Sequence, residues 1–259
     1  TADGAQGPGV FAVNATGEIT VLATGAPLMA PKGIALSSDG QTLYVADPEA
    51  AAETGQGQLF ALAVSGGAPT PLAGAAGSAP VNLEVANQEG ADLLYFSGID
   101  PSDGAPAVLS LSQDGLGHSI VAKGEPLVQP QGLAVTNAGV VYVVDTQGAG
   151  DGLAGVVRIE DGAATLITRG FRTGVLAGAT LTEDEGALLV SALHPQRASA
   201  QVLVIVLADG TQGIINAVIE ANDGSGGVHR AHESNVLAWA DSSDGGSVYK
   251  IKPPRASGN

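Results

Sequence analysis

A glutamate and a histidine that could act together in chemistry fall at equivalent positions of a repeated segment, Glu84 and His229. A carboxylate and an imidazole within reach of each other can share a proton or hold a metal ion. Asn82, two residues before Glu84, supplies an amide oxygen that a hard cation accepts as a ligand. The sequence therefore predicts His229 and Glu84 as catalytic residues, and Asn82 and Glu84 as metal ligands. The alternative is a solvated site with unrelated polar groups.

The same pairing makes a prediction about protonation. A carboxylate near His229 favours the charged imidazole and raises its pKa, whereas burial lowers that pKa. The residues at neighbouring positions are mostly Gly, Ala and Thr, which leave room for water. We therefore expect the carboxylate to prevail and the pKa of His229 to be raised.

Other polar groups favour structural roles. His229 and His232 are three residues apart, so on a strand they point to opposite faces and cannot easily bind one ion. Asp47, Asp145 and Asp241 recur at the end of one strand of the repeat, where an aspartate accepts hydrogen bonds from local backbone amides. The segment His194–Arg197 is an exposed loop that could belong to a binding rim.

These residues are positioned by a repeat of about 50 residues. The segment "PKGIALSSDGQTLYVAD" at 31–47 returns as "QPQGLAVTNAGVVYVVD" at 129–145, and weaker copies lie between and after them. Each copy contains four short apolar runs separated by turn residues such as Asp39-Gly40. This pattern predicts an all-β fold, a β-propeller of four-stranded antiparallel blades.

The repeat units begin at Gly33, Asn82, Gly132, Gly178 and Gly227, which predicts five blades. The fifth unit lacks its last strand, and two further runs lie at 9–15 and 18–25. We expect these N-terminal strands to complete the last blade and close the ring, since an open ring leaves sheet edges unpaired. The alternative is six blades, with part of one missing upstream. We expect a single domain over 1–259, with a core of about 9–253 and a tail at 254–259.

Side chains alternate along a strand, so alternate residues of the inner strands are expected to line the central channel. That layer contains Ala35, Glu84, Ala134, Thr180 and His229. The intervening residues, among them Leu83, Leu133 and Val228, are then expected between blades. A shift of one residue in the last unit would instead place Arg230 in the channel and His229 between blades.

Composition limits the function. The chain has 10 Lys and Arg against 26 Asp and Glu, a net charge of −16, and it has no cysteine. An acidic surface repels nucleic acid and anionic lipid, and the lack of cysteine excludes disulfides and thiolate chemistry. No apolar run is long enough for a membrane span. Low Lys with abundant Ala, Gly, Thr and Asp is typical of an exported bacterial protein, either periplasmic, secreted or surface-anchored.

The segments at 31–47 and 129–145 resemble the repeat shared by NHL-repeat proteins and by gluconolactonase, strictosidine synthase-like and paraoxonase-like propellers. The resemblance implies a propeller and leaves open both catalysis and binding. In hydrolytic members a calcium ion lies at one mouth of the channel, held by Glu, Asn and Asp. The corresponding loops here carry Lys32, Asn82, Gln131, Ala177 and Gly226. Asn82 fits such a ligand and Gln131 offers a second amide oxygen, but the carboxylates are absent from the matched positions.

Two functions remain open. The first is an exported, non-catalytic binding or interaction propeller that uses one rim and the central channel to bind a small molecule or a protein. The second is a calcium-assisted hydrolase or lactonase, in which Asn82 and Glu84 hold the ion and His229 acts as base.

Overall fold

The chain forms strands along most of its length, as the short alternating apolar runs predict. The computed structural model describes residues 2–4, 7–53, 55–88, 90–194, 200–219, 225–231, 234, 236–241 and 247–251. Within these residues the only helical segment is a short 3-10 turn, Ala73–Ala75. The chain divides into two units, Thr1–Leu127 and Val128–Asn259, and each is described by itself. The single-domain boundary stays a prediction.

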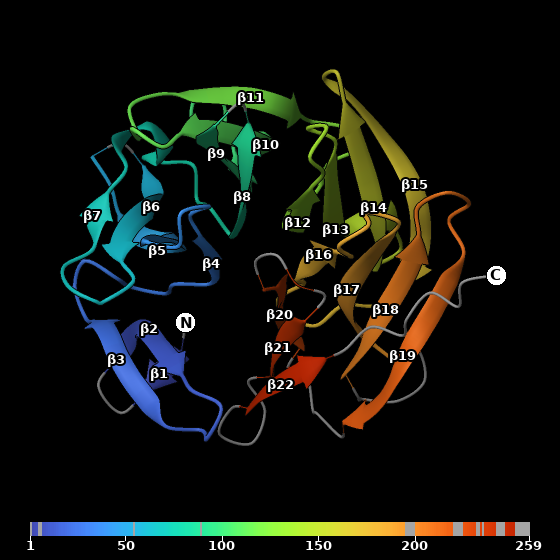
Figure 1. Ribbon diagram of the computed structural model, residues 1–259. Helices are drawn as coiled ribbons and strands as arrows, with labels where there is room; N and C mark the ends of the chain where they lie inside the picture. Colours follow the sequence, from blue (N-terminus) through green and yellow to red (C-terminus); the bar gives the residue numbers. More distant parts are fainter. Residues whose placement is uncertain are drawn as a thin grey trace. The chain divides into compact units, whose positions relative to one another are not determined.

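The first unit contains three antiparallel sheets (Figure 1). The N-terminal sheet consists of β1 (Ala2–Gly4), β2 (Gly7–Val13) and β3 (Ile19–Thr24). Blade 1 consists of β4 (Gly33–Leu36), β5 (Thr42–Ala51), β6 (Gln56–Ala63) and β7 (Thr70–Pro71). Blade 2 consists of β8 (Asn82–Gln88), β9 (Ala91–Ile99), β10 (Pro106–Ser112) and β11 (His118–Lys123).

The second unit also contains three antiparallel sheets. Blade 3 consists of β12 (Pro130–Val135), β13 (Val141–Gly150), β14 (Leu153–Glu160) and β15 (Ala163–Phe171). Blade 4 consists of β16 (Ala179–Leu181), β17 (Ala187–Leu193), β18 (Ala200–Val206) and β19 (Gln212–Ile219). Blade 5 consists of β20 (Ser225–Arg230), β21 (Leu237–Asp241) and β22 (Ser247–Ile251).

Each repeat unit of the sequence therefore forms one sheet, in which successive strands pair as neighbours. The predicted fold class is confirmed: the chain is an all-β propeller whose five repeat units give five blades. Four of these blades have four strands, and blade 5 has three within the described residues. The tight turns have the expected chemistry. Ser37 and Asp39 bond each other and the amide of Gln41, and Gly40 adopts a positive φ of 71°.

The predicted pairing of the N-terminal strands is wrong. β2 pairs with β1 along one edge and with β3 along the other, so these strands form a sheet of their own. The strands of blade 5 form a separate sheet, in the order β20-β21-β22. The reason is that β1 pairs with the edge of β2 that was expected to pair with a strand of the last blade. Within the described residues, the N-terminal strands thus form a three-stranded sheet of their own and pair with no strand of blade 5.

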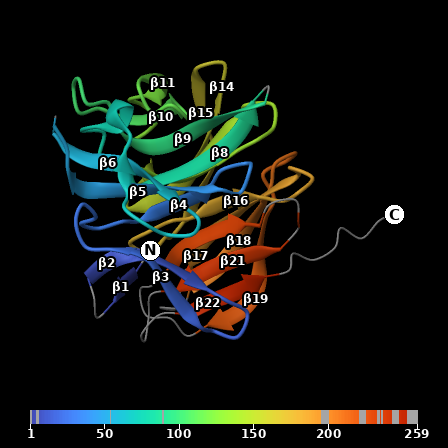
Figure 2. The ribbon, with the colours of Figure 1, turned by 60° about the vertical axis from the view of Figure 1, so that its left-hand side comes forward.

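In the first unit, neighbouring sheets pack face to face through aliphatic side chains. The N-terminal sheet and blade 1 share a core that includes Val10, Leu28 and Phe60. Blades 1 and 2 share another that includes Leu59 and Phe96, and their inner strands β4 and β8 lie side by side (Figures 1 and 2). Burial of these apolar side chains is the main force that holds the sheets together.

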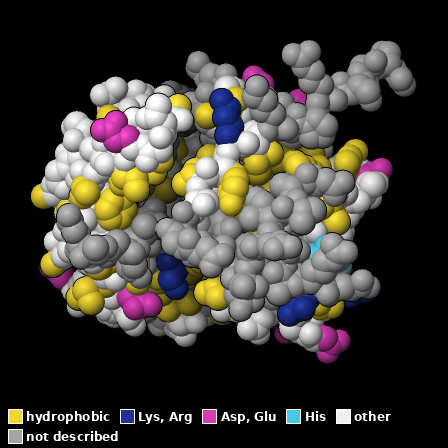
Figure 3. Space-filling model, turned by 90° about the horizontal axis from the view of Figure 1, so that it is seen from below, with side chains coloured by type: hydrophobic (Ala, Val, Ile, Leu, Met, Phe, Trp, Pro, Cys, Tyr) yellow, Lys and Arg dark blue, Asp and Glu magenta, His cyan; other side chains and the backbone are white. Residues whose placement is uncertain are grey.

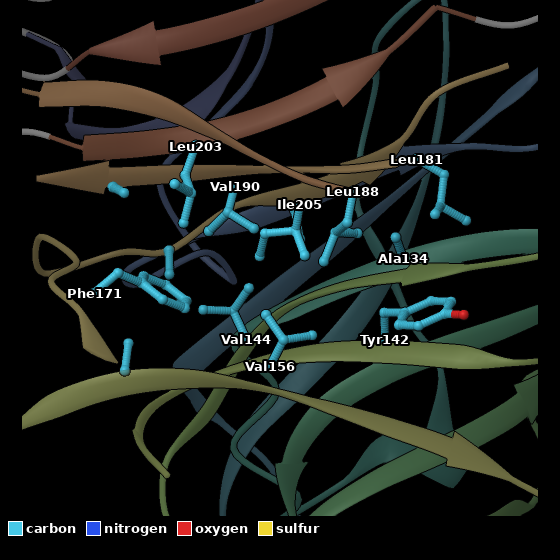
Figure 4. Close-up of a cluster of buried hydrophobic side chains, with 14 residues drawn as sticks. Ala134, Tyr142, Val144, Val156, Phe171, Leu181, Leu188, Val190, Leu203 and Ile205 are labelled. Carbon is cyan, nitrogen blue, oxygen red and sulfur yellow. The ribbon is translucent and has the colours of Figure 1, made fainter. Parts of the chain in front are cut away.

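The second unit repeats this arrangement. Blades 3 and 4 enclose a core that includes Val144, Val156, Leu188 and Ile205, shown in Figure 4. Blades 4 and 5 enclose a second core around Trp239, which is fully buried and lies 5.4 Å from Tyr249 between ring centroids. Because only 3% of the residues are aromatic, Val, Leu, Ile and Ala supply most of this packing, as the composition predicts.

Glycines at the start of the inner strands allow close approach between blades. A Cβ on Gly33 would lie 2.7 Å from the Cα of Asn82, and one on Gly178 would lie 2.3 Å from the backbone nitrogen of Val228. A Cβ on Gly132 would lie 2.3 Å from the carbonyl oxygen of Ala177. These distances are too short for any side chain, which explains why these three repeat units begin with glycine.

Of the residues expected to line a central channel, three are buried within their own units, so the expectation is wrong for them, while Glu84 and His229 are half-buried. Ala35 packs in the core between blades 1 and 2, and Ala134 packs in the core between blades 3 and 4. Thr180 is also buried. Blade 1 is packed on one face against the N-terminal sheet and on the other against blade 2, so successive side chains of its strands face two neighbouring sheets.

The predicted positions of Leu83 and Leu133 are confirmed, because both side chains are fully buried. Leu83 lies in the core shared by blades 1 and 2. We expect Leu83→Ala to lower the free energy of unfolding by about 2–5 kcal/mol, since it removes apolar contacts and leaves a cavity. Urea unfolding measures the loss. Leu116→Ala is the control, because Leu116 is 77% exposed and its loss should be within about 0.5 kcal/mol.

Candidate functional site

Asn82 and Glu84 lie on β8 and point to the same face of that strand, because they are two residues apart. Asn82 is buried, and its side-chain oxygen accepts a 2.7 Å hydrogen bond from the amide of Leu83. The backbone N–H of Asn82 donates to the hydroxyl of Ser97 at 3.3 Å. The oxygen predicted as a metal ligand is therefore used to order the start of β8. Glu84 is half-buried, opposite Tyr95 on β9.

His229 lies on β20, opposite Ala238, and is half-buried. Its neighbour Val228 is fully buried opposite Trp239, so the predicted register is confirmed and the alternative with Arg230 in its place is excluded. Glu84 belongs to the first unit and His229 to the second. Their pairing therefore stays a prediction.

The protonation of His229 differs from the expectation. Burial lowers the pKa of His229 from 6.5 to about 4, so desolvation prevails over any carboxylate. The unfolded chain therefore binds more protons than the folded chain between pH 4 and 6.5, so this site destabilises the fold as the pH falls through that range.

We expect the His229 ring to titrate near pH 4 in an NMR experiment. His229→Asn should make stability less dependent on pH between 4 and 6.5, as urea unfolding at several pH values would show. Glu84→Gln tests the pairing itself. An unchanged His229 titration in that variant would remove the pairing, and a titration of the parent near 6.5 would contradict the account of burial.

The remaining histidines and acids do not form a metal centre within the described part of the chain. No group of three or more His, Cys, Asp or Glu is placed there to hold an ion. His232, residues 195–197 of the predicted rim and the side chain of Asp241 lie outside the described residues. His194 is half-buried at the end of blade 4.

Asp47 has the structural role predicted for it, and it also bonds backbone amides that are distant in the sequence. Its carboxylate is fully buried and accepts hydrogen bonds from four backbone amides. Two of them are local, Glu49 at 3.1 Å and Ala50 at 3.0 Å. The other two, Met29 at 2.7 Å and Ala30 at 3.1 Å, belong to the loop that leads into β4. Asp47 therefore fixes this lead-in loop, residues 25–32, to the end of β5.

Asp145 makes the equivalent contacts in blade 3. It is fully buried and accepts from the amides of Val128 at 2.7 Å, Gln129 at 3.0 Å and Gln147 at 3.0 Å. Both lead-in loops also share their pattern of burial. Leu28 and Leu127 are buried, whereas the next residues, Met29 and Val128, are 59% and 50% exposed. Each buried carboxylate thus fixes a loop whose apolar side chain is exposed to solvent at the end of the blade.

Gln131, predicted as a possible calcium ligand, instead joins two loops of the second unit. Its side-chain oxygen accepts from the amide of Ala177 at 2.8 Å, and its side-chain nitrogen donates to the carbonyl of Val175 at 3.2 Å. Gln131 is buried, while Val175 is 75% exposed. The loop before blade 4 therefore also presents an apolar side chain, held by a neighbouring blade.

Exposed amides lie beside Val128. The Gln129 side-chain oxygen accepts from the Thr146 hydroxyl at 2.9 Å and from the Gln147 side chain at 2.8 Å. Because the strands of a blade alternate in direction, lead-in loops and second-to-third-strand connections lie at one end of their blade. We call this end of each blade its lead-in rim, and it carries Met29 in blade 1, Val128 in blade 3 and Val175 in blade 4. Hydrophobic side chains also reach the surface in several patches on the face in Figure 3.

Sequence reasoning missed the lead-in rim, although a signal for it is present. "GAPLMAPKG" at 25–33 and "GEPLVQPQG" at 124–132 share Gly, Pro, Leu, Pro and Gly at the same positions, and an aspartate follows 14 residues or so after each. The strand repeat alone directs attention to the inner strands. The loop repeat indicates that the same local structure is built twice.

Comparisons with known proteins place the fold. No protein-family model matches the chain, and no curated protein matches it. Similar solved structures include a protein described as TolB from Agrobacterium tumefaciens, with a TM-score of 0.69 and 12% identity, over 91% of this chain and 81% of that one. A chain of a nidogen–laminin complex has a TM-score of 0.64 and 13% identity, over 89% and 80%.

A gluconolactonase from Xanthomonas campestris has a TM-score of 0.60 and 19% identity, over 88% of this chain and 74% of the enzyme. At these identities the likeness concerns the fold alone. The neighbours include gluconolactonase-like and TolB-like propellers, in agreement with the resemblance of the repeat. No helix in the described part of the chain is long and apolar enough to cross a membrane.

Proposed function

We propose that this chain is an exported binding or interaction propeller that holds its partner at the lead-in rim of a blade. The observation that carries the proposal is the pair of buried carboxylates, Asp47 and Asp145, each of which fixes a loop with an exposed apolar side chain. Burying a carboxylate requires several hydrogen bonds in compensation. Here the backbone amides that compensate the buried carboxylates include those of Met29 and Val128, so both side chains are held in a fixed, solvent-exposed position. A fixed position of this kind is what a preorganised contact surface requires.

The neighbouring folds support this proposal in general terms. They include a chain from a nidogen–laminin complex and TolB-like propellers, as well as lactonase-like enzymes. Export is part of the proposal because the chain has few lysines and abundant Ala, Gly, Thr and Asp. The partner is a protein or a small molecule, not a nucleic acid, since the chain repels phosphates.

The test replaces the exposed apolar residue of each of three lead-in rims by serine in one variant, Met29→Ser with Val128→Ser and Val175→Ser. A matched control carries Val64→Ser, Leu116→Ser and Val206→Ser, three exposed apolar residues at the opposite ends of their blades. Affinity isolation from the exported fraction of the source cells should recover a partner with the parent and the control but not with the rim variant. Equal recovery by all three proteins would overturn the proposal.

A calcium-assisted lactonase is the second candidate, and the likeness to a gluconolactonase is the observation that favours it. A ligand that binds only the folded state raises the melting temperature. Because Asn82 and Gln131 use their side-chain oxygens on backbone amides, we expect the same melting temperature in millimolar calcium and in excess chelator. A rise with calcium, together with calcium-dependent lactone hydrolysis that Glu84→Gln abolishes, would favour the lactonase.

A further inference from the structure

The lead-in rim of blade 1 combines an exposed apolar side chain with exposed carboxylates. Met29 is 59% exposed, and its amide bonds the same buried carboxylate as the amide of Glu49. Glu49 is therefore a spatial neighbour of Met29, although it is twenty residues away in the chain. Glu49 and Glu53 are both exposed at this end of the blade.

These two carboxylates differ from two other acids at this end of the first unit. Asp100 and Asp103 are paired with Lys123, whose ammonium lies 2.6 Å and 3.0 Å from them. Within the described residues, neither Glu49 nor Glu53 forms an ion pair. The basic residue in the same lead-in loop is Lys32, and its side chain is half-buried. A partner with a positive charge would therefore find Glu49 beside Met29, and Glu53 at the same end of the blade, as carboxylates that are not already neutralised by an ion pair among the described residues.

The equivalent end of blade 3 has no carboxylate at the position of Glu49, and its exposed carboxylates, Glu125 and Asp151, lie elsewhere in the lead-in loop and in the turn after β13. Val128 corresponds to Met29, and Gln147 corresponds to Glu49, because each bonds its blade's buried aspartate in the same way. The Gln147 side chain is engaged with Gln129. The two ends therefore share one backbone scaffold but differ in a carboxylate, which would let a cationic partner distinguish them.

We propose that the lead-in rim of blade 1, with Met29, Glu49 and Glu53, binds a cationic segment of a partner protein in which a Lys or Arg adjoins an apolar side chain. The inference rests on the proposed function, and it names the chemistry of the partner. The unbranched thioether of Met29 adapts to apolar side chains of different shape. The carboxylates pair with the basic residue, and the net charge of −16 steers it toward the surface.

The test uses the fact that Met29 is the only methionine. Selective labelling of its methyl group with carbon-13 gives one NMR signal that reports on the rim. The probes are two synthetic peptides, Gly-Lys-Leu-Gly-Arg-Leu-Gly and a matched peptide with Glu in both basic positions. We expect the basic peptide to shift the methyl signal and the acidic peptide to leave it unchanged.

Three variants assign the effect to this site. Glu49→Gln should weaken the basic peptide about threefold, because it removes one exposed charge pair. Glu183→Gln removes an equal charge from the turn between β16 and β17 and should leave binding unchanged. Gln147→Glu adds a carboxylate at the equivalent position of blade 3. It should leave the Met29 methyl signal, and its titration with the basic peptide, as in the parent. Equal weakening by Glu49→Gln and Glu183→Gln would mean non-specific attraction, and would overturn the inference.

The inference and the proposed function fail in different ways. If the basic peptide leaves the Met29 methyl signal unchanged while the serine variant of the rim still loses its partner, the rim binds a partner without a cationic segment. If the serine variant keeps its partner, the proposed function fails, whatever the peptide does.

Discussion

Asp47→Ala should lower the free energy of unfolding by about 3 kcal/mol or more. The change leaves four backbone amides without their acceptor, and each buried amide that loses its partner costs about 1–3 kcal/mol. Met29, Ala30 and Ala50 provide three of these amides, and the carboxylate itself is fully buried. The loss should appear as a lower urea midpoint with little change in slope.

The matched control is Asp114→Ala. Asp114 is an exposed turn aspartate at the other end of a blade in the same unit, where it bonds the Ser112 hydroxyl and the Leu116 amide. We expect a loss under about 1 kcal/mol, because water replaces these bonds. If Asp47→Ala cost no more than Asp114→Ala, the buried carboxylate would not be what holds the lead-in loop.

Gly178→Ala should cost about 3 kcal/mol or more, at the upper end of what overpacking costs. The added Cβ would lie 2.3 Å from the backbone nitrogen of Val228 and 2.8 Å from the Cα of Gly227. Both atoms belong to the inner strand of blade 5, so the clash can be relieved only if one whole sheet moves from its neighbour. Urea unfolding and the yield of soluble protein measure the effect.

Gly213→Ala is the control in the same unit. Gly213 lies in β19, and a Cβ there would meet nothing within 4 Å. The substitution should be neutral or stabilise the fold by up to about 1 kcal/mol, because alanine has fewer unfolded conformations than glycine. A Gly178→Ala protein as stable as the Gly213→Ala protein would show that blades 4 and 5 do not pack this closely.

The blades could be predicted from the sequence because their signal is local. Alternation of apolar residues and turns such as Asp39-Gly40 determine each hairpin, and the repeat determines the register, which placed Leu83 and Val228 correctly in the core. The structural role of Asp47 and Asp145 also followed from their recurrence, since every copy of a repeat needs the same local bonds.

The features that could not be predicted depend on contacts between residues that are distant in the sequence. β2 had two available edges, and its partner β1 is only three residues long, too short to show a pattern. The side chains of Asn82 and Gln131 could have faced a metal or a backbone amide, and only the surrounding loops decide between these. Met29 and Val128 read as ordinary apolar loop residues until the buried carboxylates that hold them are seen.

The most direct test of a partner at the lead-in rim is site-specific photo-crosslinking in the exported fraction of the source cells. A photoreactive amino acid replaces Met29 in one protein and Leu116, which is 77% exposed at the opposite end of blade 2, in the other. We expect a defined crosslinked partner from position 29 and none from position 116. The same adducts from both positions, or none from position 29, would contradict the account.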